Sequence, residues 1–127
     1  MTEDEIGKII VDSAVNLHMD LGPGLLESVY EVILCKLLTK KGLSVQRQVS
    51  IPIKYKEEHF DEGFRVDLLV DGKVIIELKS IEKINDVHKK QLLTYLKVTN
   101  IKLGFLLNFG ADLMKNGIIR IVNGLPE

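Results

Sequence analysis

Apolar residues recur every three to four positions in three segments of the chain, which is the spacing of one face of a helix. The first segment predicts a helix over about residues 3–20, ended by the turn sequence LGPG. The second predicts a helix over about 25–41, ended by Gly42. The third predicts a helix over about 85–98, with Asn85 as its cap.

Between and after these segments the chain carries runs rich in β-branched residues, separated by turn signals. These runs predict five strands, with the sequences SVQRQVSIPIKY, HFDEGFRVDLLV, KVIIELKS, KLGFLLNF and GIIRIV. The order is helix, helix, three strands, helix, strand, strand. We therefore expect residues 1–127 to form a single α/β domain with a mixed β-sheet flanked by helices.

The turn between the second and third strands decides which side chains share a face of the sheet. A two-residue Asp71-Gly72 loop would pair Val70 with Lys73 and would send Asp67 and Glu77 to opposite faces. A three-residue loop separates apolar from polar residues far better, so we predict that loop, with Gly72 at a positive φ.

The three-residue loop pairs Leu69 with Lys73 and Asp67 with Ile75. One face then carries Val66, Leu68, Val70, Val74, Ile76 and Leu78. The other carries Arg65, Asp67, Ile75, Glu77 and Lys79. In this register the two acids are diagonal neighbours, about 7 Å apart at the backbone, and their carboxylates can converge.

Composition narrows the classes of protein that fit this fold. The chain has 127 residues, a net charge of −1 and a single cysteine, which excludes an internal disulfide. No CxxC pair marks a structural zinc site or an iron–sulfur cluster, and we expect a cytoplasmic protein. The acidic start of the chain is unlike a signal peptide, and no apolar run approaches the roughly 20 residues that span a bilayer. Because there is no overall basic field, contact with nucleic acid would depend on a local patch.

The acids Asp67 and Glu77 bring their own chemistry to the shared face. Two converging carboxylates repel each other unless one takes a proton or a cation lies between them. Mg²⁺ or Mn²⁺ suits such a site, since these ions bind a few carboxylate oxygens and keep several waters. Lys79 could then orient or deprotonate an attacking water, or neutralise charge on a phosphate. A salt-bridge cluster on a half-solvated sheet is the alternative interpretation.

The spacing of these residues resembles a known family. Asp67, nine intervening residues, and then Glu77-Leu78-Lys79 in a hairpin between helices is similar to the core of the PD-(D/E)XK nuclease superfamily. The sequence GLLESVY, at 24–30, resembles the Gly-x-x-Glu-x-x-Tyr signature of the GxxExxY family within it. The similarity continues through VDLLVDGKVIIELKS, QLLTYLKVTN and LGFLLNFG, although Val66 stands where the superfamily name has proline. The resemblance implies a restriction-endonuclease-like core.

The resemblance also implies roles for residues outside the hairpin. Glu27 matches the helical acid that completes the metal site in such nucleases, often through a water; the alternative is an acid favoured by the helix dipole. Tyr30 would hydrogen-bond Glu27 or reach a phosphate, or else be a core tyrosine. Gln91 and Tyr95, four apart on one helix face, resemble an accessory motif of RecB-type nucleases that helps to place the substrate or the lysine. A solvated helix face is the alternative for this pair.

Further polar residues are weaker candidates for the same site. His18 precedes the Gly-Pro-Gly turn, and a histidine upstream of the helical acid binds metal in some RecB-type relatives. Arg65 and Ser80 flank the proposed centre and are candidates for phosphate contact only.

Three function hypotheses follow from these residues. The first is a Mg²⁺- or Mn²⁺-dependent nuclease acting on DNA or RNA, which the complete set of acid, acid and lysine favours. The second is a module that binds nucleic acid or a protein without cutting, which the near-neutral charge favours. The third is a structural module for homo-oligomerisation. Under the first hypothesis the partner is nucleic acid, and a homodimer would be compatible with the apolar content.

Overall fold

The computed structural model describes residues 1–126, apart from the side chain of Glu62. The helices are α1 (Glu3–Leu21), α2 (Glu27–Lys40) and α3 (Asp86–Thr99), with a 3-10 turn η1 (Met114–Asn116). The strands are β1 (Val45–Tyr55), β2 (Glu58–Val70), β3 (Val74–Lys79), β4 (Leu103–Asn108) and β5 (Ile118–Val122). The three helices and five strands expected from the sequence pattern are therefore confirmed, with bounds shifted by one or two residues.

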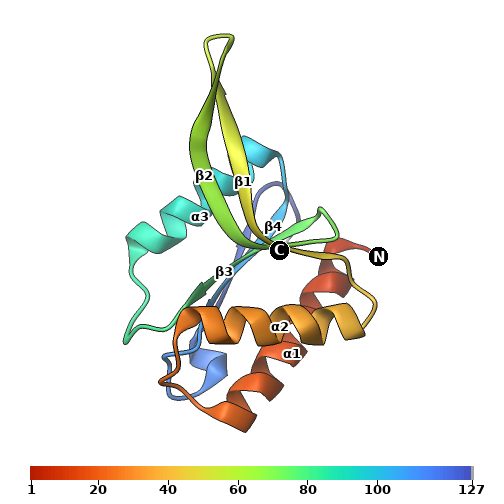
Figure 1. Ribbon diagram of the computed structural model, residues 1–127, viewed down its shortest axis with the longest axis vertical. Helices are drawn as coiled ribbons and strands as arrows, with labels where there is room; N and C mark the ends of the chain where they lie inside the picture. The colour runs from red at the N-terminus through yellow and green to blue at the C-terminus, as the bar shows by residue number, and fades with distance from the viewer. Residues whose placement is uncertain (127) are drawn as a thin grey trace.

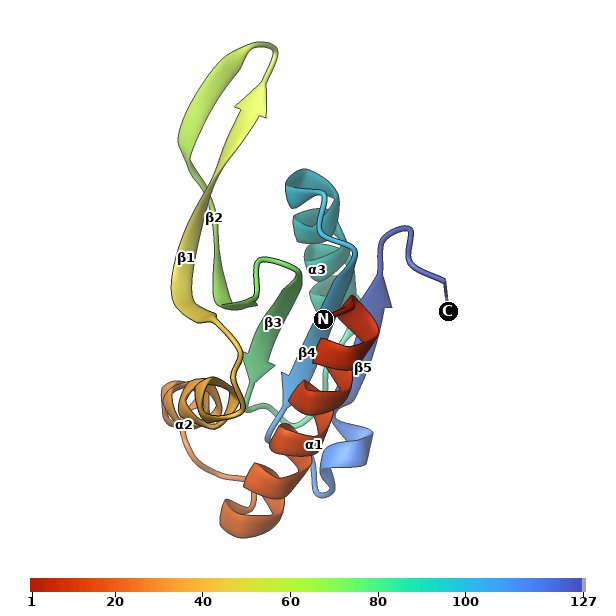
Figure 2. The ribbon, with the colours of Figure 1, turned by 90° about the vertical axis from the view of Figure 1, so that its right-hand side faces the viewer.

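The five strands form one sheet in the order β1-β2-β3-β4-β5. Neighbouring strands are antiparallel except β3 and β4, which are parallel because α3 connects them as a crossover. Figure 2 shows α1 and α3 on opposite sides of β4, and Figure 1 shows α2 packed across α1. This mixed sheet flanked by helices confirms the expected α/β class.

Two hydrophobic clusters lie on the two faces of the sheet. The larger joins α1 and α2 to one face through side chains such as Ile10, Leu34 and Ile76. The smaller joins α3 to the other face and includes Ile75 and Leu92. Strand β3 is consequently buried on both faces, as expected for a strand with a parallel neighbour and helices above and below. Polar groups on β3 are thus placed in a largely desolvated environment.

The loop between β2 and β3 contains three residues, and Gly72 has φ 65°, as predicted. Asp71 is also left-handed, at φ 51°, and the Lys73 N–H donates to the Val70 carbonyl at 2.9 Å. The Asp71 carboxylate accepts the Ser44 N–H at 2.7 Å, and its own N–H donates to the Ser44 carbonyl. Asp71 is thereby held outside the ladder between β2 and β3.

The observed partners are Val70 with Val74, Leu69 with Ile75, and Leu68 with Ile76. The predicted pairing of Leu69 with Lys73 and of Asp67 with Ile75 was therefore wrong, because the loop comprises residues 71–73 rather than 70–72 and Val70 stays in the ladder. Continued by one position, the observed register sets Asp67 directly opposite Glu77 rather than diagonal to it. Both registers have the same parity, so regular alternation would keep the two acids on one face; the shared face stays a prediction, because alternation breaks between Val66 and Leu68.

Strands β1 and β2 extend past the rest of the sheet as a long two-stranded arm (Figure 1; Figure 2). Strand β2 pairs with β3 only as far as Leu68, and its earlier residues pair with β1 alone. Two-stranded ribbons twist more than wider sheets. Val66 accordingly packs into the smaller cluster beside α3, whereas Leu68 packs into the larger one. The expectation that Val66 and Leu68 share one continuous apolar face was therefore wrong.

Candidate active site

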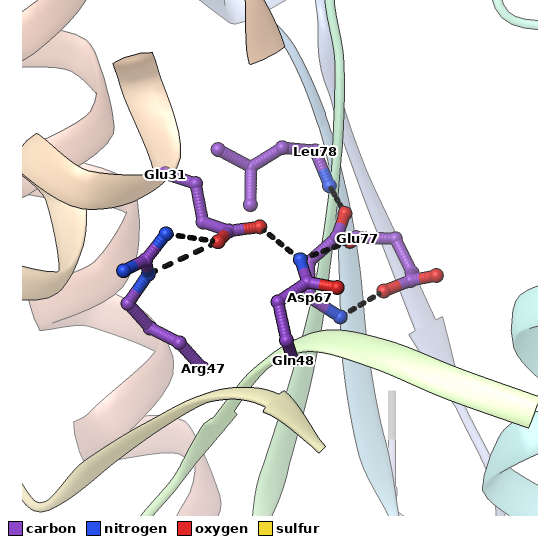
Figure 3. A network of polar contacts seen from close by, with 6 residues as sticks. All are labelled: Glu31, Arg47, Gln48, Asp67, Glu77 and Leu78. Atoms are coloured by element: carbon purple, nitrogen blue, oxygen red, sulfur yellow. Dashed lines mark hydrogen bonds and ion pairs between the residues drawn. The ribbon is translucent and has the colours of Figure 1, made fainter. Parts of the chain in front are cut away.

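Asp67 and Glu77 lie where β2 and β3 part. Backbone pairing ends at Leu68 and Ile76, and beyond that point the two carboxylates take over the bonding between the strands. The Asp67 N–H donates to Glu77 Oε2 at 2.7 Å, and the Leu78 N–H donates to Asp67 Oδ2 at 2.8 Å (Figure 3). Each carboxylate thus accepts a backbone N–H of the opposite strand, which fixes both side chains.

Glu77 is buried, at 8% exposure, and no cationic side chain of the described residues forms an ion pair with it. Its burial raises the pKa of the carboxyl to about 8, and the nearby charge of Asp67 adds to the rise. The hydrogen bond from the Asp67 backbone and the charge of Lys79 lower the pKa only in part. Glu77 therefore retains its proton at neutral pH when no cation is bound.

Lys79 ends β3, two residues beyond Glu77 and on the same face of the strand. Its side chain is half-buried, and its charge acts on Glu77. Within the part of the chain that the structure describes, no carboxylate oxygen lies within salt-bridge distance of Lys79. A cationic group beside the two acids is thus available to a ligand.

A second group of polar residues adjoins the acids, and the sequence interpretation missed it. Glu31 of α2 is 5% exposed, and its Oε2 accepts from Arg47 Nε at 3.0 Å and Nη2 at 2.9 Å. Gln48 Nε2 donates to Glu31 Oε1 at 2.7 Å and to Asp67 Oδ1 at 3.3 Å (Figure 3). The signal in the sequence was an acid on the apolar face of the second helix, in line with Leu34 and Leu38.

Helix α3 reaches the acids with Tyr95. The Tyr95 ring is stacked on Phe64 of β2 with centroids 4.0 Å apart. Burial raises the pKa of the Tyr95 phenol, and the charges of Glu77 and Asp67 raise it further, whereas the Gln91 side chain lowers it. The structure thus brings the predicted pair Gln91 and Tyr95 to the side of the acids that α3 covers.

A family model described as the PD-(D/E)XK nuclease superfamily matches residues 4–121. The chain belongs to this superfamily. No curated protein and no solved structure matched the chain. Membership in the superfamily implies a nucleic-acid substrate, and nucleases of this superfamily generally depend on divalent metal ions. The mixed sheet and its flanking helices are consistent with the restriction-endonuclease-like fold.

The helical acid that the superfamily resemblance implied, Glu27, is the first residue of α2 and is exposed. It lines a surface pocket together with Ser80, whose hydroxyl donates to the Leu25 carbonyl at 2.7 Å. Among the described residues, no hydrogen bond joins Glu27 to Asp67 or Glu77. The polar network of the described residues therefore includes Glu31, one turn further along α2, and does not include Glu27.

Two further candidates from the superfamily comparison have other partners. Tyr30 is fully buried; its hydroxyl donates to the Gly22 carbonyl at 2.5 Å and accepts the Leu25 N–H at 3.2 Å. These bonds hold the loop before α2, which favours the core-tyrosine interpretation over contact with a phosphate. His18 Nε2 lies 2.8 Å from the Ala111 carbonyl, and no acid among the described residues bonds to His18.

The donor set at Asp67 and Glu77 fits the kind of metal ion that this superfamily uses. The described residues contain no group of three or more metal-binding side chains arranged around one point. Two carboxylates supply only oxygen donors, and the raised pKa of Glu77 indicates that its buried negative charge is not balanced by a nearby positive one. Hard divalent cations that keep several waters, such as Mg²⁺ and Mn²⁺, match this chemistry.

None of the helices in the described residues is long and apolar enough to cross a bilayer.

Proposed function

We propose that this protein is a Mg²⁺- or Mn²⁺-dependent nuclease that hydrolyses phosphodiester bonds of DNA or RNA, within one domain of the GxxExxY type. The observation that supports this most is the juxtaposition of Asp67 with a buried Glu77 whose pKa is raised to about 8. A purely structural sheet has no need for two adjacent acids without a cation. Perturbed acids of this kind are typical of functional sites.

Each residue of the set has a separate role in the proposed reaction. Asp67 and Glu77 would hold the metal, which when bound would lower the pKa of a water and neutralise charge on the phosphate. Lys79 orients the attacking water and stabilises the negative charge that develops on the phosphate oxygens. The backbone N–H groups of Asp67 and Leu78 keep the carboxylates in place, so little reorganisation is needed when substrate binds.

Residues around this set would contact the substrate or complete the metal shell. We propose that Glu27, exposed beside Ser80, completes the shell through a water. Gln91 and Tyr95 would contact the nucleic acid from the side of α3. Tyr30 would act indirectly, by holding the loop before Glu27. A homodimer and a cytoplasmic location remain predictions from the sequence.

The second candidate function is a module that binds nucleic acid without cutting it. The net charge of −1 favours it, because nonspecific affinity for nucleic acid depends largely on contacts between basic residues and phosphates. This module would keep the fold and the acids but would not turn over substrate.

Replacing Lys79 by alanine separates the two functions. Lys79→Ala removes the water-orienting cation but no metal ligand, so metal binding should persist while cleavage falls about 10²–10⁴-fold. Lys90→Ala, at an exposed position on α3, is the matched control and should cut as the wild type does. The substrates are single-stranded, duplex and branched nucleic acids, incubated with Mg²⁺ or Mn²⁺.

Two further observations complete this experiment. Cleavage must require the divalent ion and must disappear in Glu77→Gln, which excludes a contaminating nuclease. If Lys79→Ala cuts at the wild-type rate, the role given to Lys79 is wrong. If the wild type binds nucleic acid but cuts no substrate, the binding module replaces the nuclease.

A further inference from the structure

Gln48 has an unusual backbone conformation in the middle of β1. Its φ is 52°, in the left-handed region that residues other than glycine rarely adopt. Its neighbours are paired regularly with β2, Arg47 with Leu68 and Val49 with Val66, so Gln48 lies across from Asp67. Strained backbone of this kind, held by regular structure on both sides, is often found at functional sites.

The left-handed conformation explains a contact that a regular strand cannot make. Successive side chains of a strand point to opposite faces. Arg47 and Gln48 are successive, yet both bond the same Glu31 carboxylate, Arg47 at Oε2 and Gln48 at Oε1 (Figure 3). The turn of the backbone at Gln48 therefore brings two adjacent side chains to one acid.

The amide group of Gln48 joins Glu31 to Asp67. Its nitrogen donates to Glu31 Oε1 at 2.7 Å and to Asp67 Oδ1 at 3.3 Å, and an NH₂ group has two hydrogens for these two acceptors. Because the Leu78 N–H bonds Asp67 Oδ2, both oxygens of Asp67 are held. A neutral amide orients the carboxylate without adding a positive charge that would compete with a cation.

We propose that Gln48 is a positioning residue for Asp67, and that it links this carboxylate to α2 through Glu31, which Arg47 holds in place. The proposal rests on the proposed function, because it assigns Gln48 to the metal-binding carboxylate of the nuclease. Outer partners that orient metal ligands typically change metal affinity or activity about 10–100-fold when they are removed.

Two substitutions of Gln48 and one control test this role. Gln48→Met keeps the length of the side chain but removes its donors, and Gln48→Gly removes them while favouring the left-handed backbone. Glu57→Gly is the matched control, because Glu57 is also left-handed, at φ 68°, but lies at the exposed tip of the arm. If one Gln48 variant fails to fold, the other still tests the proposal.

The first measurement uses the metal-free protein. Without Gln48 the Asp67 carboxylate loses one of its two fixed contacts, so the Leu78 amide that bonds it should exchange its hydrogen faster. The second measurement is a titration with Mn²⁺, in which both Gln48 variants should bind about 10–100-fold more weakly than the wild type. Glu57→Gly should change neither quantity.

The two measurements keep the two proposals separate. Unchanged exchange at Leu78, or faster exchange with unchanged Mn²⁺ affinity, would overturn the positioning role while the nuclease proposal stands. If the wild type neither binds Mn²⁺ nor cuts nucleic acid, the proposed function fails; exchange at Leu78 then decides alone whether Gln48 holds Asp67.

Discussion

The protein buries two glutamates in neighbouring regions and treats them differently. Glu31, between α2 and β1, is 5% exposed and is bonded by the Arg47 guanidinium and the Gln48 amide. Glu77, between β2 and β3, is 8% exposed; within the described part of the chain its carboxylate accepts a backbone N–H and no side-chain donor, while a second acid lies beside it. The Arg47 guanidinium neutralises Glu31. The carboxyl of Glu77 has no such partner among the described residues and instead has a raised pKa.

Under the proposed function, this difference distinguishes a structural acid, Glu31, from a metal-binding one, Glu77. A buried carboxylate is tolerated when a cation and hydrogen bonds replace the water that it loses. Glu31 has both, so the Arg47 guanidinium and the Gln48 amide compensate its charge within the folded chain. Among the described residues Glu77 has no ion-pair partner, and under the proposed function a divalent ion would supply the missing positive charge. Sequences that break local rules of stability often do so at functional sites.

Among the changes that test this contrast, a change of pH should have the largest effect on the free energy of unfolding. Because the pKa of Glu77 is raised from 4.5 to about 8, the folded state holds a proton that the unfolded state releases. The contribution of Glu77 to stability is therefore complete below pH 4.5 and is lost as pH rises through 8. The free energy of unfolding of the metal-free protein should fall by about 5 kcal/mol over this window through Glu77 alone.

Urea unfolding at several pH values, in the presence of a chelator, measures this fall. Glu77→Gln cannot release a proton and should lose this part of the pH dependence. Glu57→Gln, which changes an exposed acid, should retain it. Equal slopes in Glu77→Gln and the wild type would show that Glu77 is ionised in the folded protein.

Removing the Arg47 guanidinium, the cationic partner of Glu31, should have the next largest effect on the free energy of unfolding. Arg47→Met keeps the aliphatic stem of the side chain but leaves Glu31 buried with only the Gln48 amide. Breaking a buried ion pair costs about 3–5 kcal/mol, and we expect the lower end because the Arg47 side chain is 43% exposed. Arg120→Met breaks the more exposed pair with Asp4, also 2.9 Å long, and should cost less than about 1 kcal/mol. Similar losses in the two variants would contradict the structural role of the Arg47 pair.

Adding a divalent ion should stabilise the Glu77 region by a smaller amount. At a free Mg²⁺ or Mn²⁺ concentration of 100 times Kd, the wild type should gain about 2.7 kcal/mol, seen as a higher melting temperature. Asp67→Asn should abolish this response and leave the metal-free protein no less stable, because it removes the charge that disfavours ionisation of Glu77 while an amide oxygen can still accept the Leu78 N–H. Asp86→Asn, at an exposed acid in the first turn of α3, is the control. An equal response in Asp67→Asn and the wild type would remove Asp67 from the metal site.

Periodicity and turn signals were enough to predict the elements of the fold and the three-residue loop with Gly72 at a positive φ. Both depend on local patterns, namely helical spacing, alternation along strands and the Asp-Gly turn. The exact register was not predictable, because it depends on the bonds between Asp71 and Ser44, a residue 27 positions away. The side taken by Val66 was missed because the twist of the free arm is a property of two strands together.

The site was predicted less completely than the fold. Asp67, Glu77 and Lys79 could be grouped because they lie on one hairpin. Gln48 could not be found from alternation, since its role depends on a left-handed backbone that the sequence does not mark with glycine or asparagine. Glu31 left a readable signal, an acid on an apolar helix face, but its partner Arg47 comes from another element.

The polar network around the acids has a consequence for chain topology. Its hydrogen bonds join residues that are at most 19 positions apart, as between Gln48 and Asp67. By contrast, the bond between His18 and Ala111 spans 93 positions. The loops that close to assemble the network are therefore short. Closing them costs less chain entropy than closing a longer loop, although this cost grows only slowly with length. In these terms the polar network is local to one continuous stretch of chain, from α2 to β3, whereas Tyr95 approaches it from α3 and the bond between His18 and Ala111 closes a much longer loop.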